Sequence, residues 1–291
     1  MRITAHAKVN WSLSVLGRRA DGYHALDMLM QSIALGDSIE ILPADELLLA
    51  VADKAAVPRD GGNIALRAAE LVREAMGVTQ GARILLRKRV PVCAGLGGGS
   101  ADAAAVLLGL NALWGLGLGE RELRGLALGL GADVPFCLAG GLARARGVGE
   151  LLTRLEAPAR LELVIVKPAG GLSTPAVFAA YDGLAEKPRN PDMESAMAAL
   201  LAGDTGTLAK AMGNALQGAA AALEPEIAVC IQALEHHGAL RAQMTGSGSA
   251  VFGLFASADG AARAAQALKP IWPQTFHTYT VGQGVSIVSG G

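Results

Sequence analysis

The stretch PVCAGLGGGSADAAAVLLGL, residues 91–110, places four glycines in the five positions from Gly95 to Gly99, directly before a helix of small residues. Backbone N–H groups can surround a phosphate only where side chains do not block its approach, and glycine removes that obstacle. A helix that begins behind the loop adds unpaired N–H groups and the positive end of its dipole. The sequence therefore predicts a phosphate cradle, with Ser100 as the N-cap of a helix over Ala101–Trp114.

The standard phosphate signatures do not match this stretch. The dinucleotide pattern GxGxxG fails because Ser100 stands at its third glycine, and the Walker A pattern fails because no lysine directly follows a glycine. A flexible turn, or a close contact between a helix and a strand, is the alternative explanation of the glycines. The strand before the loop and the helix after it favour the phosphate cradle.

Composition narrows the class of protein. The 291 residues are enough for two packed units, and a net charge of −1 with 4% aromatic residues argues against a nucleic-acid-binding surface. Cys93, Cys137 and Cys230 lie far apart without CxxC spacing, so we expect neither a zinc site nor a disulfide framework. No apolar run approaches the roughly 20 residues of a membrane span. We therefore expect a soluble cytoplasmic protein.

The order of the predicted elements indicates an α+β protein with two domains, 1–153 and 154–291, and a seam near Thr153–Arg160. The first domain begins with β-rich sequence, and the second is expected to contain an antiparallel sheet with strands around AVFGLFA and FHTYTVG. Helical spacing of apolar residues predicts helices in the second domain at Thr174–Gly183, Asp192–Leu201, Gly206–Leu223, Pro225–Gly238 and Ala258–Leu268.

Seven segments between Ala7 and Phe252 resemble those of one enzyme family, in the same order. They are AKVN, RRADGYH, KRVPVCAGLGGGSADAA, GADVPFCLAGG, STPAVF, KPRN and TGSGSAVF. The family is the GHMP small-molecule kinases, which include galactokinase, homoserine kinase and mevalonate kinase. Within it, the Gly-Gly-Gly-Ser form of the loop is most similar to the kinases of the non-mevalonate isoprenoid pathway that phosphorylate a cytidyl diphosphate polyol. The resemblance implies an N-terminal ATP-binding domain and a C-terminal domain that contributes to substrate binding.

The resemblance assigns catalysis to Lys8 in AKVN and Asp133 in GADVP. Asp133 would accept the proton of the acceptor's hydroxyl, or mainly orient that hydroxyl, while Lys8 would hold the carboxylate ionised and draw charge from the reacting oxygens. Taken alone, an aspartate two residues before a proline is commonly a turn or cap residue, and a lysine in an apolar strand commonly reaches solvent. Asn10 shares a strand face with Lys8 because side chains alternate along a strand.

The resemblance also implies ATP with Mg²⁺, because magnesium usually binds through substrate phosphates. No residue is assigned to the metal, although Ser100 is placed to contact the metal or a phosphate. Asp102 departs from the asparagine or alanine expected there, and its carboxylate would lie close to a bound triphosphate. The implied ATP-binding residues are Pro91, Val92, Cys93, Ala94, Gly95, Leu96, Gly97, Gly98, Gly99, Ser100 and Ala101, with Asn63 and Lys88 near the adenine.

Aromatic residues near these motifs fit recognition of a cytosine. Tyr23 and Phe178 would stack on its two faces, and His24 would bind its edge. Taken alone, Phe178 is typical of a core and Tyr23 of a half-buried strand, and Tyr181 is a weaker candidate for stacking. The second glycine loop, TGSGSA, would position the acceptor, or form a turn into the next strand. The implied acceptor-binding residues are Asn10, Tyr23, His24, Phe178, Thr245, Gly246, Ser247 and Gly248.

Three other functions remain open from the sequence. The nearest is another GHMP kinase, acting on homoserine or mevalonate. An oxidoreductase would require a parallel βαβ unit with an acidic residue about 20 residues further on, and the segment in question has a helical pattern instead. A nucleotide-binding regulator without catalysis is the third. For the kinase we expect small-molecule partners, no nucleic acid or membrane, and a monomer or weak homodimer.

Overall fold

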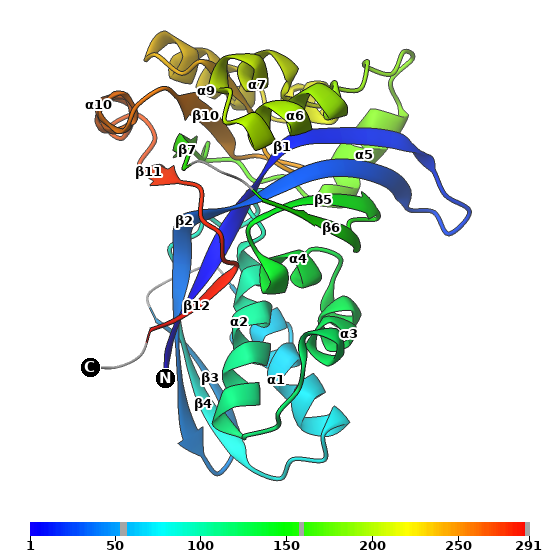
Figure 1. Cartoon of the computed structure of the whole chain (residues 1–291), viewed down its shortest axis with the longest axis vertical. Helices are drawn as coiled ribbons and strands as arrows, with labels where there is room; N and C mark the ends of the chain where they lie inside the picture. Colours follow the sequence, from blue (N-terminus) through cyan, green and yellow to red (C-terminus); the bar gives the residue numbers. More distant parts are fainter. Residues whose placement is uncertain (53–56, 157–159, 289–291) are drawn as a thin grey trace.

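The computed structural model describes residues 1–52, 57–156 and 160–288 and has the predicted α+β architecture, built on two sheets (Figure 1). The larger sheet centres on two long antiparallel strands, β1 (Arg2–Arg18) and β2 (His24–Ala44). Register shifts interrupt their pairing at three places, one of them between His6 and Lys8. Such irregularities re-aim side chains, and Lys8 lies directly after one. The sheet also contains β3 (Leu47–Ala52), β4 (Gly81–Arg87), β5 (Leu142–Gly147), β6 (Leu151–Leu155), β8 (Gly213–Asn214) and β12 (Val285–Val288).

The helix behind the first glycine loop, α2 (Gly98–Leu113), lies at the centre of the first half and packs on β1 and β2. Its small side chains allow close approach on nearly every side, because a Cβ at Gly109 would come within 2.6 Å of Ile3 and 2.5 Å of Ile41. The residue pattern is therefore that of a buried helix rather than an amphipathic one. Its helical neighbours are α1 (Ile64–Ala75), α3 (Glu120–Leu130) and α4 (Val134–Ala139).

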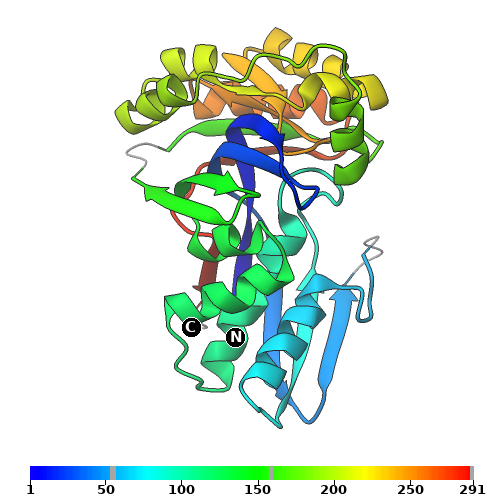
Figure 2. The same cartoon turned by 90° about the vertical axis from the view of Figure 1, so that its right-hand side faces the viewer.

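The second sheet has four antiparallel strands in the order β11-β7-β10-β9, as predicted for this half. Its central strands are almost wholly buried, and α9 and α10 pack on it. Figure 2 shows most of the second-half helices on the side of this sheet that faces away from α1–α4, whereas α5 lies beside β1 and β2 (Figure 1). The elements are β7 (Glu162–Val166), α5 (Thr174–Asp182), α6 (Met193–Ala202), α7 (Thr205–Ala211), α8 (Gln217–Leu223), α9 (Glu226–His236), β9 (Arg241–Met244), β10 (Val251–Phe255), α10 (Ala258–Leu268) and β11 (Thr275–Tyr279).

The two halves share a core and backbone pairing. Trp11 of β1 packs edge-on against Phe252 of β10, with ring centroids 5.4 Å apart. Both β8 and β12, from the second half of the sequence, pair with β1. The domain limits 1–153 and 154–291 stay a prediction, and residues 157–159 of the expected seam lie outside the described residues.

The predicted helix Gly206–Leu223 is wrong as one element. It is divided into α7 and α8 by the short strand β8, which pairs with β1. The Asn214 side chain donates to the carbonyl oxygens of Met244 (3.0 Å) and Gly246 (2.8 Å), and Ala215 N–H donates to Leu13 (2.9 Å). These contacts with distant segments replace the helical hydrogen bonds that the local pattern predicts.

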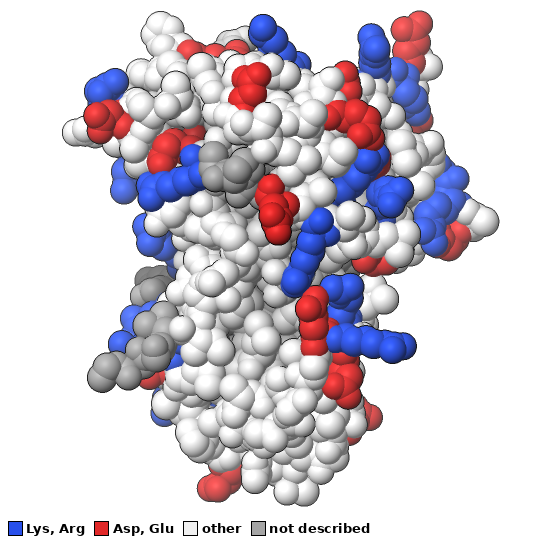
Figure 3. All heavy atoms as spheres, in the orientation of Figure 1, with Lys and Arg blue, Asp and Glu red and all other residues white. Residues whose placement is uncertain are grey.

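Two surface observations bear on partners. No helix in the described ranges has the length and apolar character that crossing a bilayer requires. Figure 3 shows basic and acidic side chains interspersed on the face that it presents, in line with the near balance of charges in the sequence.

Candidate active site

The first glycine loop leads into α2 through left-handed backbone at Gly95 (φ +72°) and Gly97 (φ +69°). The N-cap is Gly97 and the helix begins at Gly98, so the prediction of Ser100 as N-cap is wrong and Ser100 lies in the first helical turn. The reason is that glycine turns the chain into the helix earlier than a serine cap would. No side chain caps this end, which leaves the first N–H groups of α2 available to an anion.

The two glycine loops pack backbone against backbone. A Cβ at Gly95 would lie 2.1 Å from the carbonyl oxygen of Thr245 and 3.0 Å from the amide nitrogen of Gly248. Ala250 N–H donates to the carbonyl of Ala94 (3.1 Å), which fastens the second loop to the first. These contacts explain why glycine is required at 95 on two grounds, the positive φ and the close approach.

Comparing Gly95→Ala with Gly77→Ala should distinguish the cost of the positive φ from the cost of the close contact between the loops. Gly77 also has a positive φ (+61°), but nothing lies within 4 Å of its Cβ position. We expect Gly77→Ala to lower the free energy of unfolding by about 1–2 kcal/mol, the cost of left-handed backbone. Gly95→Ala should cost about 1–3 kcal/mol more through overpacking, measured by urea denaturation. Equal losses in the two variants would contradict the packing of the loops.

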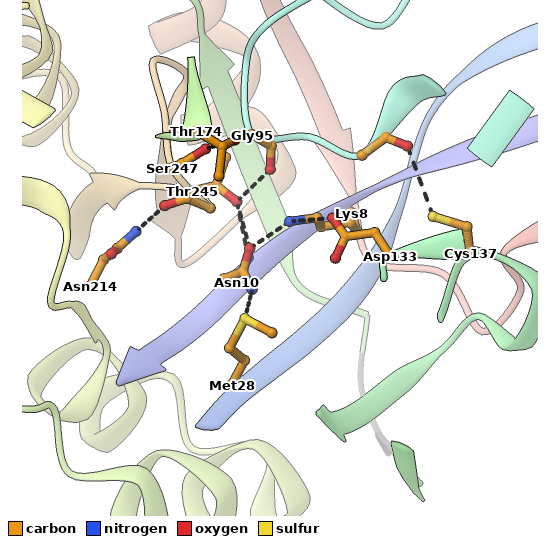
Figure 4. Close-up of polar contacts among 12 residues, drawn as sticks. Lys8, Asn10, Met28, Gly95, Asp133, Cys137, Thr174, Asn214, Thr245 and Ser247 are labelled. Carbon is orange, nitrogen blue, oxygen red and sulfur yellow. Dashed lines mark hydrogen bonds and ion pairs between the residues drawn. The ribbon is translucent and has the colours of Figure 1, made fainter. Parts of the chain in front are cut away.

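Lys8 and Asp133 lie together beside these loops (Figure 4), with Lys8 Nζ 3.5 Å from Asp133 Oδ2. Lys8 Nζ also donates to Asn10 Oδ1 (2.8 Å), so the expected shared face of Lys8 and Asn10 is confirmed. The Lys8 side chain is 5% exposed and does not escape to solvent. Asp133 occupies the N-cap of α4 but makes no capping hydrogen bond, which leaves its carboxylate directed to Lys8.

Thr245 connects this pair to the second glycine loop. Its hydroxyl accepts from Asn10 N–H (3.1 Å) and lies 3.4 Å from both Asn10 Oδ1 and the Gly95 carbonyl oxygen. Nearer the opening, the hydroxyls of Thr174 and Ser247 are hydrogen-bonded at 2.8 Å, linking the start of α5 to the loop (Figure 4). The loop is therefore attached to β1 and α5.

One cavity of about 1020 Å³ brings most of the predicted residues together. Its size suits a nucleotide with a second substrate, at the upper end of small-molecule sites. Among the predicted site residues, Ala101 and Thr245 are fully buried and do not line it. The predicted residues that line it are Lys8, Asn10, Tyr23, His24, Asn63, Lys88, Pro91, Val92, Cys93, Ala94, Gly95, Leu96, Gly97, Gly98, Gly99, Ser100, Asp133, Phe178, Gly246, Ser247 and Gly248.

At the aromatic end of the cavity, His24 lies against Phe178, with ring centroids 4.6 Å apart and ring planes 18° from parallel. Tyr23 is 67% exposed, and Tyr181 is buried and meets His24 edge-on. In this arrangement one face of Phe178 is covered by the imidazole. A base held between Tyr23 and Phe178 therefore stays a prediction.

Two buried carboxylates share one ammonium beneath the first glycine loop. Lys88 Nζ lies 2.5 Å from Asp37 Oδ2 and 2.6 Å from Asp102 Oδ2. Asp102 Oδ1 has no hydrogen-bond partner among the residues that the structure describes. Burial raises the pKa of Asp102 to about 8, with the charge of Asp37 acting in the same direction and Lys88 opposing both. Burial lowers the pKa of Lys88, but the two carboxylates outweigh it and the net shift is upward.

The two residues expected near the adenine have structural contacts as well. Asn63 caps α1 by accepting from Ala65 N–H (3.0 Å). The ammonium of Lys88 is bound by the carboxylates of Asp37 and Asp102. Their contact with an adenine stays a prediction.

The acidic partners of the site were not predicted. Asp182 accepts a hydrogen bond from His24 and lies one helical turn after Phe178, a spacing that is visible in the sequence. Asp37 has no comparable signal, because it meets Lys88 only through the pairing of β2 with β4.

How magnesium would be held stays a prediction. Among residues 1–52, 57–156 and 160–288, no group of three His, Cys, Asp or Glu side chains is arranged to hold a metal ion. The N-terminus of α2 and the cradle of Gly95–Gly98 fit a polyphosphate, because no side chain caps the first N–H groups of this helix. The order of elements also excludes the dinucleotide-binding unit, because α2 is followed by α3 and α4 and not by a parallel strand.

Comparison with known families gives two matches along the chain. A model described as "GHMP kinases N terminal domain" matches residues 63–141, and one described as "GHMP kinases C terminal" matches residues 196–273. The first includes the glycine loop and Asp133, and the second includes Thr245 and the second loop.

Individual relatives cover almost the whole chain. The 4-diphosphocytidyl-2-C-methyl-D-erythritol kinase of Pelotomaculum thermopropionicum is 47% identical over 264 residues, 90% of this chain and 91% of that protein. The enzyme of the same name from Moorella thermoacetica is 42% identical and covers 97% and 99%. A crystal structure of 4-(cytidine 5'-diphospho)-2C-methyl-D-erythritol kinase superposes with a TM-score of 0.83 at 40% identity, covering 97% of this chain and 100% of that one. Homoserine kinase from Cytophaga hutchinsonii, at 23% identity, TM-score 0.76 and coverage of 99% and 97%, shares the fold.

Proposed function

The chain belongs to the GHMP kinases and, within them, to the 4-diphosphocytidyl-2-C-methyl-D-erythritol kinases, and we propose that it phosphorylates the 2-hydroxyl of that polyol. It is an ATP-dependent small-molecule kinase of isoprenoid precursor synthesis. The observation that carries the proposal is a single cavity that holds the glycine loop, the Lys8–Asp133 pair and the His24–Phe178 pair.

The chemistry of the step follows from what these side chains offer. The acceptor's hydroxyl oxygen forms a bond to the γ-phosphorus while the bond between that phosphorus and the leaving oxygen of ADP breaks. The hydroxyl proton passes to the Asp133 carboxylate, and Lys8, 3.5 Å away, stabilises the negative charge on that carboxylate and nearby oxygens. Asn10 holds the ammonium of Lys8 in place through its side-chain oxygen.

The donor side of the reaction is assigned to the first glycine loop. The free N–H groups at the start of α2 and the glycine cradle would hold the phosphates of ATP, with Ser100 in the first turn. Magnesium, bound through those phosphates with Ser100 as a candidate contact, would neutralise charge on the transferred group. Asn63 and Lys88 remain the proposed adenine-side residues, both in the wall of the cavity.

The acceptor side is assigned to the opposite wall. Tyr23, His24 and Phe178 would bind the cytosine, and Gly246–Gly248 would approach the rest of the acceptor. Since His24 covers Phe178 in this arrangement, a stacked base would require the imidazole to move, or would stack against Tyr23 alone.

Product identification tests the function directly. The purified chain is mixed with Mg-ATP and, separately, with 4-diphosphocytidyl-2-C-methyl-D-erythritol, homoserine or mevalonate, and the products are identified by mass spectrometry and phosphorus NMR. We expect ADP and the 2-phosphate with the first acceptor and no product with the other two. Product from homoserine or mevalonate alone would assign the chain to a different kinase, and no ATP consumption with any acceptor would favour a regulator.

The compartment and the oligomeric state of the enzyme are also part of the proposal. Cys93, Cys137 and Cys230 are free thiols, as is usual in a reducing compartment, and we assign the enzyme to the cytoplasm. A monomer or weak homodimer remains the predicted state.

A further inference from the structure

Helix α5 meets His24 with two side chains that lie one helical turn apart. Phe178 stacks on the face of the imidazole at 4.6 Å, and Asp182 Oδ1 lies 2.8 Å from its Nε2. Residues four apart project from the same side of a helix, so one rigid element contacts both the face and an edge of the ring. The orientation of His24 is therefore set by α5.

The contact with Asp182 also decides where the proton of the neutral imidazole lies. An ionised carboxylate only accepts hydrogen bonds, so Nε2 must carry the hydrogen. Nδ1 is then left as an acceptor, and it makes no hydrogen bond to any described residue. Since His24 lines the cavity, an acceptor group of the chain is available to a ligand there.

That acceptor distinguishes two pyrimidines. Cytosine carries an exocyclic amine, which donates, where uracil has a carbonyl oxygen, which only accepts. An unprotonated Nδ1 can accept a hydrogen bond from the amine of cytosine. With uracil, Nδ1 and the carbonyl oxygen would be two acceptors facing each other. A site built to pair with a donor rejects an analogue that lacks it, because buried polar groups are then left unpaired.

We propose that Asp182 is a positioning residue for base selection, which holds His24 protonated at Nε2 so that Nδ1 accepts from the amine of cytosine and disfavours uracil. The inference rests on the proposed function, which supplies a cytidine-bearing acceptor. Asp182 does not contact the base in this scheme and acts only through His24.

The end of α5 holds Asp182 in position. Lys187 Nζ donates to the carbonyl oxygens of Tyr181 (2.9 Å), Asp182 (2.8 Å) and Leu184 (2.8 Å). A cation at a helix C-terminus satisfies carbonyls that lack a helical partner and opposes the dipole. These bonds involve the backbone, so exchanging the Asp182 carboxylate for an amide leaves them intact.

The test compares CDP and UDP binding by calorimetry in the full chain, in Asp182→Asn and in Asp259→Asn. Asp259 is an exposed aspartate on α10 and is not among the residues that line the cavity, so it is the matched control. The amide of asparagine can either donate to Nε2 or accept from it, so the ring hydrogen of His24 is no longer held at Nε2. We expect Asp182→Asn to lose about tenfold in CDP affinity, equivalent to about 1.4 kcal/mol, with UDP affinity unchanged or raised. The loss should not exceed that of His24→Ala, and Asp259→Asn should match the parent chain.

Nitrogen NMR of labelled histidine reports which ring nitrogen of His24 carries the hydrogen. A purely structural role of Asp182 would not change that tautomer. At pH 8 we expect the ring hydrogen at Nε2 in the parent chain and a mixture of tautomers in Asp182→Asn. Protonation of the parent ring at Nδ1, or an unchanged ratio of CDP to UDP affinity in the variant, would overturn the inference. The parent spectrum tests it even if the variant does not fold.

The two proposals fail in different ways. An inactive parent chain with the acceptor and Mg-ATP overturns the proposed function. A parent chain that forms the 2-phosphate, together with an Asp182→Asn variant of unchanged base preference, overturns only the role of Asp182.

Discussion

Replacing Asp133 with asparagine is expected to lower kcat by about 10³-fold while the fold survives, because a positioned proton acceptor contributes about 10²–10⁴-fold to a rate. Its carboxylate makes no capping hydrogen bond in α4, and its main charged contact is Lys8. Removing the charge therefore leaves the packing of α4 unchanged. The measurement is steady-state kinetics with the cytidyl polyol and Mg-ATP, with Tm recorded alongside.

A second variant tests whether Lys8 and Asp133 act as one unit. Lys8→Met removes the ammonium but keeps a similar buried volume, and it should also reduce kcat strongly. If Lys8 acts on Asp133 and the transferred group as one unit, the double variant should lose little more than the worse single variant. Asp259→Asn is the control and should retain the parent rate. A kcat within threefold of the parent in Asp133→Asn would remove Asp133 from the proton path.

The part of the site that could be predicted from residues alone is the part that depends on local backbone. Gly95 and Gly97 adopt positive φ, which glycine permits most readily, and the small residues behind them indicate a closely packed helix. The shared face of Lys8 and Asn10 follows from the alternation of side chains along a strand. Such features need no knowledge of distant partners.

The remaining features depend on contacts between distant segments. The division of 206–223 into two helices is caused by hydrogen bonds with Met244, Gly246 and Leu13, which no helical periodicity reports. Lys8 reaches Asp133 only because β1 passes beside both α4 and the glycine loop. Family resemblance assigns these two residues to one site, whereas their spacing in the sequence does not.

The burial of Asp37, Lys88 and Asp102 was likewise not predicted, since isolated charges in a sequence are usually read as exposed. The arrangement has one cation for two carboxylates, and two adjacent carboxylates cannot both ionise without cost. Burial raises the pKa of Asp102 to about 8, and the charge of Asp37 adds to this shift while Lys88 opposes it. It has consequences for stability that can be measured without any substrate.

Removing Lys88 should be the most destabilising single exchange at this cluster. Lys88→Met leaves two buried carboxylates without their shared ammonium, and breaking a buried ion pair in this way costs about 3–5 kcal/mol. Arg124→Met, which breaks the exposed pair between Arg124 and Glu120 in α3, should cost less than about 1 kcal/mol. Urea denaturation at pH 7 measures both losses, and comparable values for the two variants would contradict the burial of the cluster.

The pH dependence of stability should identify Asp102 as the proton-holding member. The ordinary value of 3.8 applies to the unfolded chain and about 8 to the folded one, so between these limits the folded chain holds more protons. The free energy of unfolding contributed by Asp102 is therefore fully present below about pH 4 and falls as the pH rises through 8. Asp102→Asn keeps an oxygen for Lys88, leaves a neutral Asp37–Lys88 pair and removes this dependence. The variant should therefore gain stability relative to the parent chain from pH 5 to about pH 8, and the difference should level off between pH 8 and pH 9. Urea denaturation across that range, with Asp259→Asn as the control for loss of a carboxylate, measures the difference. Parallel pH profiles for the parent chain and Asp102→Asn would mean that Asp102 is ionised throughout and that the proton lies elsewhere.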